Sequence, residues 1–214
     1  MRYSTHPAFE RIAFIVPTPR RTILFSALAA TMLPATSIWG ADAVFHGRTE
    51  PQPELPRDFR LQDGHNQWHT MADFRGSVVL VFFGYTQCPD VCPTELTRLA
   101  RLKQALGKDA DRVQVVFITI DPERDTTEIM RDYPALFHPA FVGLRGTPQG
   151  TLDATRTFKV YAEKMPGPTP SSYTVDHSTF VYGFDSHGRL RVRLTPGLTA
   201  DEMLADVRTL LSIP

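Results

Sequence analysis

Two apolar, β-branched runs dominate the sequence and restrict the folds that are open to it. They are SVVLVFFGY at Ser77–Tyr85 and VQVVFITI at Val113–Ile120. Apolar runs of this length are typical of strands buried on both faces of a sheet. The segment Thr94–Leu106 between them is predicted to be a helix by its stripe of leucines: Leu96, Leu99, Leu102 and Leu106. Strand, helix and strand in this order predict a parallel pair with a right-handed crossover.

The rest of the chain supplies further helices and hairpins around this pair. Asp63-Gly64 predicts the turn of an early hairpin, and Ser186–Gly188 predicts the turn of a late one. We expect a short strand around Phe141–Gly146. Further helices are expected at three stretches: Asp125–Tyr133, Thr147–Tyr161 and Thr199–Leu211. This order of elements predicts an α/β sandwich in which helices flank a central mixed sheet.

The charge balance excludes one class of partner. The 214 residues include 23 basic and 23 acidic side chains, so the formal net charge is zero. A nucleic-acid-binding face needs a local excess of basic residues, which is not indicated here. We therefore expect no nucleic-acid partner.

The first 43 residues are predicted to be an export segment. Arg20-Arg21 precede the apolar run Thr22–Gly40, and Ala41–Ala43 then supplies a small-x-small cleavage pattern. The paired arginines allow a twin-arginine route. An uncleaved membrane anchor is the alternative, because the apolar run is at the short limit for a span.

Both alternatives place the following domain on the outer side of the membrane. We expect it in the bacterial periplasm, soluble after cleavage or tethered to the inner membrane by its N-terminal segment. Residues 44–56 are polar and contain proline, so they are interpreted as a linker. Residues 57–214 are interpreted as the globular domain.

The two cysteines, Cys88 and Cys92, lie in CPDVCP between the first buried strand and the following helix. Ligands bind at this edge of open α/β sheets, and the dipoles at a helix start stabilise thiolates. If the turn is helical, both sulfurs share one face, which suits a metal ion and still permits a disulfide. A purely structural disulfide is disfavoured, because so short a loop constrains the unfolded chain little. The pair is therefore a metal clamp, a redox couple or both.

A metal ion held by two thiolates needs a third donor, for which the chain offers seven histidines. Six of them are expected at the surface: His6, His46, His65, His69, His138 and His187. His177 precedes a strand with alternating apolar residues, and its loop can project toward the same sheet edge as the cysteines. Spacing favours His177 without establishing it as a ligand. Met165 is a further soft donor, although a packing role in its Pro-rich loop is expected.

Three motifs together resemble the Sco/SenC family of copper chaperones, which serve assembly of the dinuclear copper centre, CuA, of cytochrome c oxidase. The motifs are GYTQCPDVCPTEL, ITIDPERDT and YTVDHSTFVY, within a similarity that spans about Leu55–Leu211. The resemblance implies a thioredoxin-like (peroxiredoxin-like) three-layer fold and a copper site made by Cys88, Cys92 and His177. It also implies the copper-bearing oxidase subunit as a partner, with other copper carriers or thiol reductases as further candidates.

The resemblance also places carboxylates beside this site. Asp121, the first residue of DPERD, lies near the copper site in the family and is expected to support the ligands or tune their redox behaviour. Capping of the turn at the strand end is the alternative role. Asp176 is expected to orient the loop or to hydrogen-bond the ring of His177.

The implied ligand set suits copper in both oxidation states. Soft thiolates favour Cu(I), and imidazole also suits Cu(II). Oxidation of the two thiols to a disulfide would remove the site, so copper loading depends on redox state. We therefore expect a copper metallochaperone. The alternative is a thiol–disulfide reductase that keeps the cysteines of the oxidase subunit reduced, and enzymatic activity is expected only in that case.

Two other functions are less favoured by the sequence. A peroxidase needs one activated cysteine, and no arginine near it is evident from the sequence. A structural zinc site usually needs a fourth protein ligand, and the chain contains no second cysteine pair.

Overall fold

The computed structural model describes residues 43–52, 57–169 and 172–214. All of these residues belong to one compact unit, Gly40–Pro214. The predicted export segment therefore lies outside the described residues, except for its last residue, Ala43. Among the residues that are described, no helix combines the length and the apolar character needed to cross a membrane.

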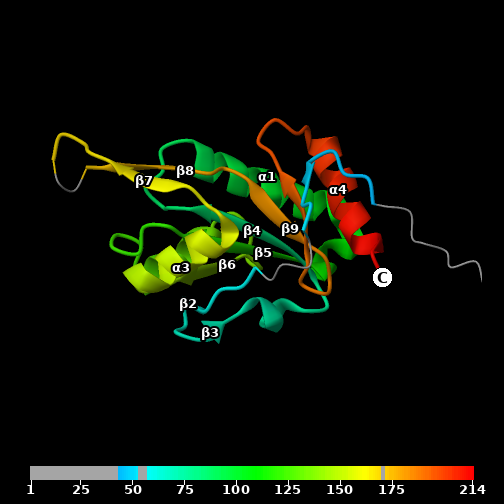
Figure 1. Ribbon diagram of the computed structural model, residues 1–214, viewed down its shortest axis with the longest axis horizontal. Coiled ribbons are helices and arrows are strands. Elements are labelled where there is room, and N and C mark those ends of the chain that lie inside the picture. The colour runs from blue at the N-terminus through cyan, green and yellow to red at the C-terminus, as the bar shows by residue number, and fades with distance from the viewer. Residues whose placement is uncertain (1–42, 53–56, 170–171) are drawn as a thin grey trace, which may run out of the picture. The chain divides into compact units, whose positions relative to one another are not determined.

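The described part of this unit is built on one eight-stranded mixed sheet (Figure 1). Strands β4, β5 and β6 are parallel, and every other pair of neighbours is antiparallel. From one edge to the other, the strands are β1 (Arg48–Thr49), β10 (Leu190–Leu194), β9 (Val181–Phe184), β4 (Val78–Gly84), β5 (Val113–Thr119), β6 (Val142–Arg145), β2 (Leu61–Asp63) and β3 (Trp68–His69).

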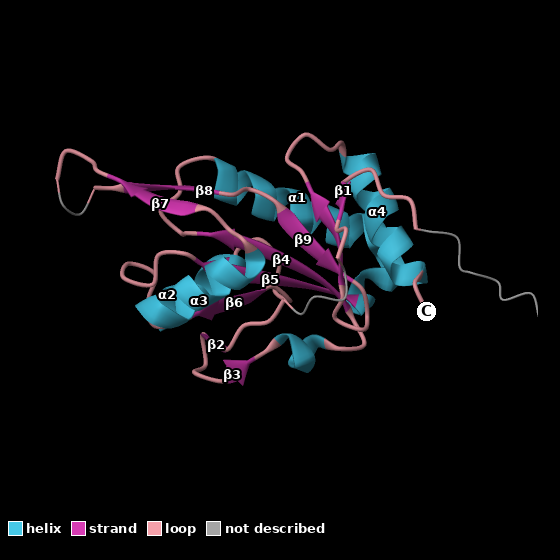
Figure 2. Cartoon of the chain, viewed as in Figure 1, coloured by secondary structure: helices cyan, strands magenta, loops and turns pink. Residues whose placement is uncertain are grey.

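Within the described residues, four α-helices cover the sheet (Figure 2). They are α1 (Val91–Leu106), α2 (Thr127–Ala135), α3 (Pro148–Phe158) and α4 (Ala200–Ser212), and two short 3₁₀ helices lie at Met71–Phe74 and Gly107–Arg112. Helices α2, α3 and α4 each begin after a threonine whose side chain accepts a backbone N–H of the first turn. The Thr199 cap is reinforced by Glu202 in a capping box.

Alternating side chains along β4 divide the core between two helical layers. Phe82 contacts Phe117 of β5, and Phe117 contacts Tyr133 of α2, so α2 covers this face. Helices α1 and α4 pack on each other. Phe83 points the other way and contacts Phe158 of α3. Each such buried ring contributes about 1.5–3 kcal/mol of apolar transfer free energy. The result is the three-layer α/β sandwich that the sequence predicts.

Part of the predicted linker belongs to the sheet. Strand β1 pairs with β10, and the Asp206 carboxylate accepts the backbone N–H groups of His46 and Gly47 at 2.7 and 2.8 Å. Glu50 is buried and pairs with Arg193 at 2.6 Å. The interpretation of residues 44–56 as a linker is therefore wrong for their first part, because polarity does not distinguish a linker from an edge strand.

A second sheet of two strands lies apart from the main one. Strands β7 (Ala162–Met165) and β8 (Thr174–His177) form an antiparallel hairpin, which projects to the left in Figure 1. We refer to this hairpin, Ala162–His177, as the arm. Its sequence predicts loops rather than strands, because β7 is exposed along its whole length and offers no apolar alternation. Met165 pairs with Thr174, at the opposite end of the arm from the pair of His177 with Ala162.

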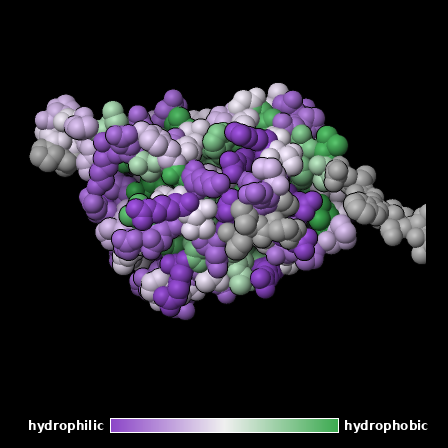
Figure 3. Space-filling model, in the orientation of Figure 1, coloured by the Kyte–Doolittle hydropathy of each residue, from purple (hydrophilic) through white to green (hydrophobic). Residues whose placement is uncertain are grey.

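The outer surface is largely polar on the face that Figure 3 shows. Hydrophilic side chains predominate there, and apolar side chains form only small separate patches. This view therefore shows no extended apolar face over the sandwich.

Candidate metal centre

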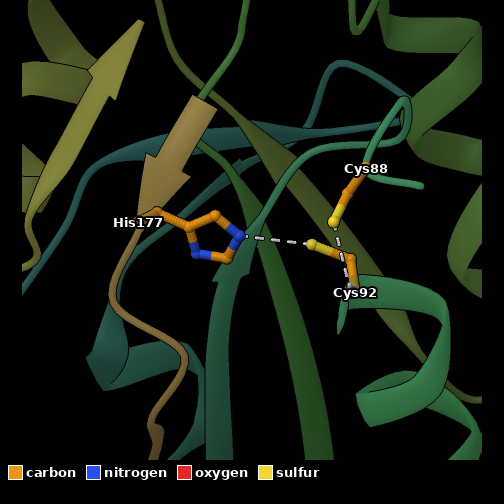
Figure 4. A group of neighbouring side chains, drawn as sticks. All are labelled: Cys88, Cys92 and His177. Atoms are coloured by element: carbon orange, nitrogen blue, oxygen red, sulfur yellow. Dashed lines mark hydrogen bonds between the residues drawn. The ribbon is translucent and has the colours of Figure 1, made fainter. Parts of the chain in front are cut away.

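The side chains of Cys88, Cys92 and His177 converge at the carboxyl end of β4 (Figure 4). Their ligand atoms all lie within 4.8 Å of one another. The sulfur of Cys92 is 3.5 Å from Nε2 of His177, although the two residues are 85 positions apart in the chain. The structure therefore brings together the three residues that the sequence predicts as copper ligands.

Cys92 occupies the first turn of α1 and is fully buried. Cys88 precedes the helix in a turn and is partly exposed. The expectation that a helical turn holds both cysteines on one face is thus only half correct. The two are linked instead through the backbone N–H of Cys92, which donates to the sulfur of Cys88 over 3.4 Å.

The two thiols have opposite acid–base character. A hydrogen bond from the Cys92 thiol, and backbone N–H groups of Asp90 and Cys92, lower the pKa of Cys88 to about 5. The same hydrogen bond to Cys88, together with burial, raises the pKa of Cys92 above its ordinary value. Without a metal ion, Cys88 is therefore the thiolate at neutral pH and Cys92 is the thiol that stabilises it.

His177 is the last residue of β8, whereas the sequence predicts a loop at this position. Its Nδ1 lies 2.8 Å from the carbonyl oxygen of Ser178, which can only accept, so Nδ1 carries the proton. The lone pair of Nε2 then points toward the cysteines, which is the arrangement that a ligating histidine needs. The rings of Phe82 and Tyr85 contact the imidazole and restrict its orientation.

The structure places the two predicted supporting carboxylates differently. Asp176 is exposed, and Nδ1 of His177 is held by the Ser178 carbonyl oxygen instead of by the Asp176 carboxylate. Asp121 is buried, and its carboxylate oxygens contact Arg124 at 2.5 Å and the hydroxyl of Tyr173 at 2.8 Å. Asp121 therefore bonds to the arm that carries His177 rather than to the imidazole.

The structure adds a carboxylate that the sequence analysis missed. Asp125 is fully buried and accepts the backbone N–H of Thr86 at 3.1 Å and the hydroxyls of Thr86 and Thr119 at 2.5 Å each. Burial raises the pKa of Asp125. Because Thr86 lies two residues before Cys88, Asp125 fixes the turn that presents the cysteines. Asp125 belongs to the same DPERD motif as Asp121, and this shared motif was the sequence signal that could have identified it.

An arginine also lies closer to the cysteines than the sequence indicates. Nη1 of Arg124 donates to the side-chain oxygen of Gln87 over 3.0 Å, and Gln87 directly precedes Cys88. The sequence-based argument against a peroxidase, that no arginine is evident near the cysteines, therefore no longer applies. The remaining argument is that the site contains two coupled cysteines instead of one.

A cavity of about 500 Å³ opens beside the cluster. Cys88 and His177 line it together with Tyr85, Asp90 and Tyr161. Cys92 lies behind them in the core. An incoming donor atom could therefore approach Cys88 and His177 from the cavity without a rearrangement of the sheet.

The donor set fits a soft metal ion. Ligand atoms that share one ion at roughly 2.0–2.3 Å lie at most about 4.6 Å apart, and the three atoms here are within 4.8 Å. Two sulfurs and one imidazole nitrogen suit copper in either oxidation state. Small side-chain rotations would complete such a site.

The chain matches a known family over most of its length. The family model for SCO1/SenC matches residues 47–212. The SCO2-like protein of Rickettsia felis is 36% identical over 141 residues, which cover 65% of this chain and 69% of that protein.

Solved structures show the same likeness. Bradyrhizobium japonicum ScoI with copper bound is 38% identical with a TM-score of 0.66, covering 72% of this chain and 98% of that one. Apo Sco1 from Thermus thermophilus is 39% identical with a TM-score of 0.70, covering 80% of this chain and 99% of that one. These relatives confirm the expected thioredoxin-like architecture.

Proposed function

The chain belongs to the SCO1/SenC family, and from this premise we propose that it is a copper metallochaperone. It binds one copper ion through Cys88, Cys92 and His177 and supplies it to the copper-bearing subunit of cytochrome c oxidase for assembly of CuA. The observation that carries the proposal is the convergence of two sulfurs and one imidazole nitrogen within 4.8 Å. The copper-bound ScoI structure, 38% identical, supports the choice of metal.

The geometry supports transfer as well as binding. The protein supplies three donors, and the cavity beside Cys88 and His177 leaves room for a donor from an acceptor protein. A thiolate of the acceptor could then bind the ion before the chaperone's own ligands release it. Cu(I), which prefers soft donors, would be held chiefly by the sulfurs, and the imidazole would add affinity for Cu(II).

A copper titration of the reduced protein tests this function. We expect one ion per chain, and Cys88→Ala, Cys92→Ala and His177→Ala should each weaken binding. His187→Ala is the matched control, because His187 lies in the turn between β9 and β10. Unchanged affinity in the His177 variant would disprove the three-ligand site.

Thiol–disulfide reduction is the second candidate function, favoured by the different pKa values of the two cysteines. The Cys88 thiolate would attack a disulfide of the oxidase subunit and form a mixed disulfide. Cys92 would then lose its proton and attack the Cys88 sulfur, which releases the target as a dithiol and leaves Cys88–Cys92 oxidised. A separate thiol reductant would restore the pair.

Turnover on a disulfide-bonded peptide separates the two functions. A reductase should work without metal and should tolerate His177→Ala, whereas copper binding should not. Fast, metal-free turnover by the His177 variant, together with weak copper binding by the wild type, would favour the reductase.

We propose an exported location for the domain, in the bacterial periplasm. The support is the sequence pattern of residues 1–43, with its paired arginines, apolar run and Ala41–Ala43 cleavage pattern. Fractionation of cells that express the full chain tests this, and mass spectrometry of the N-terminus distinguishes cleavage from anchoring. Retention of the whole chain in the cytoplasm would contradict the proposal.

A further inference from the structure

His177 lies at the end of the arm, and the arm is not part of the main sheet. The position of His177 therefore depends on how the arm is held against the domain. Strand β7 is exposed throughout, and in β8 only Val175 is buried. The arm therefore has little apolar burial of its own to hold it against the domain. Specific polar contacts of the arm therefore act together with the rings of Phe82 and Tyr85 to set how close the imidazole lies to the two sulfurs.

Arg124 provides the most connected of these contacts. Its Nη1 donates to the carbonyl oxygen of Tyr173 over 2.9 Å, and its guanidinium lies 3.6 Å from the centre of the Tyr173 ring. The same Nη1 donates to Gln87 over 3.0 Å, in the turn that presents Cys88. One side chain thus touches both separate pieces of chain that form the metal centre.

The body of the domain holds this arginine firmly. Nε of Arg124 pairs with Asp121 at 2.5 Å, the Arg124 side chain is 14% exposed and the Asp121 carboxylate is fully buried. The other oxygen of Asp121 accepts the hydroxyl of Tyr173. Arg124 and Asp121 therefore act as one ion pair that contacts the ring, the hydroxyl and the backbone carbonyl oxygen of Tyr173.

The remaining polar contacts of the arm are simpler. The ion pair of Lys164 with Glu123 joins two exposed side chains, and such pairs contribute little. The hydroxyl of Tyr85 accepts the backbone N–H of Val175 over 3.2 Å, which is a single hydrogen bond. A lysine at position 124 could not stack on Tyr173 and bridge several acceptors at once, because it lacks the planar fork of donors.

We propose that Arg124 is a positioning residue of the metal centre: it fastens the arm to the cysteine turn and thereby delivers His177 to the two sulfurs. This inference rests on the proposed function only for its copper readout. Without Arg124, the cysteines remain in place on the turn and on α1. The arm then moves away from the cysteine turn, and the imidazole of His177 moves away from the two sulfurs with it. The site then changes from three protein ligands to two.

Hydrogen exchange of the metal-free protein tests the positioning itself. In Arg124→Gln we expect the amides of β7 and β8 to exchange about tenfold faster or more, while the amides of β4 and β5 keep their protection. Arg131→Gln is the matched control, because Arg131 is exposed and pairs only with its neighbour Asp132 among the contacts described. Unchanged exchange of the arm in Arg124→Gln would overturn the proposal, whatever the protein does with copper.

Copper spectroscopy then tests the consequence for the ligand set. The Cu(II) EPR spectrum of Arg124→Gln should lose imidazole nitrogen splitting, as the spectrum of His177→Ala should. Arg124→Gln should also add almost nothing to the copper-affinity loss of His177→Ala in the double variant, because both changes remove the same ligand. Additive losses would show that Arg124 acts elsewhere.

A second variant guards against a general loss of structure. Arg124→Gln leaves the buried Asp121 carboxylate without its cation, which can destabilise the fold. Tyr173→Ala keeps that ion pair and removes the ring and hydroxyl of the arm. It should speed exchange of the arm and weaken nitrogen coordination in the same direction, with a smaller fall in unfolding temperature than Arg124→Gln, because the buried ion pair is kept. Wild-type exchange and EPR in Tyr173→Ala would count against the proposal.

Discussion

The sulfur of Cys92 lies in the space that a side chain at Gly84 would occupy. A β-carbon at position 84 would be 2.7 Å from that sulfur and 2.8 Å from the ring of Phe117. Gly84 is the last residue of β4, so the strand ends in a gap that admits the first turn of α1. The buried ligand is thus seated against the sheet by the absence of a side chain.

Gly84→Ala should displace Cys92 and weaken copper binding. The added methyl group would lie closer to the sulfur than real contacts allow, and Phe117 prevents escape to the other side. We expect a roughly 10–100-fold loss of copper affinity, measured by competition with a chromophoric chelator. Gly150→Ala is the control, because a β-carbon there would be 3.4 Å from its nearest neighbour, the hydroxyl of Thr147. Wild-type affinity in Gly84→Ala would show that the sulfur can move freely.

Alkylation of the reduced, metal-free protein should distinguish the two cysteines by pH. The pKa of Cys88 is lowered to about 5, so its reactive thiolate is present above that pH and lost below it. Cys92 has a raised pKa and should stay unreactive at neutral pH. Mass spectrometry after iodoacetamide treatment at a series of pH values should place the half-maximal rate for Cys88 near pH 5.

Cys92→Ala tests the cause of that pKa. The variant removes the thiol that donates to Cys88, so the midpoint for alkylation of Cys88 should move up toward the ordinary value of 9.0. An unchanged midpoint would assign the low pKa to the other groups around Cys88 rather than to the Cys92 thiol.

His177→Ala should affect the two oxidation states of copper unequally. The two sulfurs remain and satisfy Cu(I), whereas Cu(II) loses its nitrogen donor. Loss of a residue that only hydrogen-bonds a metal ligand typically lowers metal affinity by roughly 10–100-fold. We expect the Cu(II) affinity to fall by more than this, and the Cu(I) affinity to fall less. Parallel titrations under reducing and non-reducing conditions measure the difference, and equal losses would contradict it.

Asp125→Ala should destabilise the whole domain. It removes the acceptor for the backbone N–H of Thr86 and for the hydroxyls of Thr86 and Thr119. A buried donor without a partner costs about 1–3 kcal/mol, so we expect a loss of roughly 2–4 kcal/mol in the free energy of unfolding. Urea denaturation measures it. Asp153→Ala is the control, because Asp153 bonds only to Gln149 on the exposed face of α3 among the contacts described.

Most of the main sheet could be predicted from sequence because burial leaves a strong pattern. The run at Ser77–Tyr85 contains β4, and the run at Val113–Ile120 contains β5. The predicted end of one helix is wrong, because the local effect of a proline was given more weight than the structure shows. The predicted helix at Asp125–Tyr133 should end before Pro134, yet α2 continues to Ala135, because a proline in the last turn interrupts few helical bonds.

The sequence predicts the three ligand residues of the candidate site, but not the residues and strands that hold them in position. Cys88, Cys92 and His177 carry distinctive chemistry within recognisable motifs, so sequence identified them. The arm was missed because β7 and β8 form a ladder that stands mostly in solvent. Arg124 and Asp125 were missed because their partners, Tyr173 and Thr86, lie 49 and 39 residues away in the chain. Long-range polar contacts of this kind leave no periodic trace in one sequence.

The separation of Cys92 from His177 by 85 residues gives a bound ion a second role, as a cross-link. An ion held by both would tie the start of α1 to the end of the arm and close a long loop of chain, as a disulfide between distant segments does. Copper bound at this site would therefore make the domain harder to unfold. Delivery of the ion would also remove that tie, so the emptied protein would be the more deformable of the two forms.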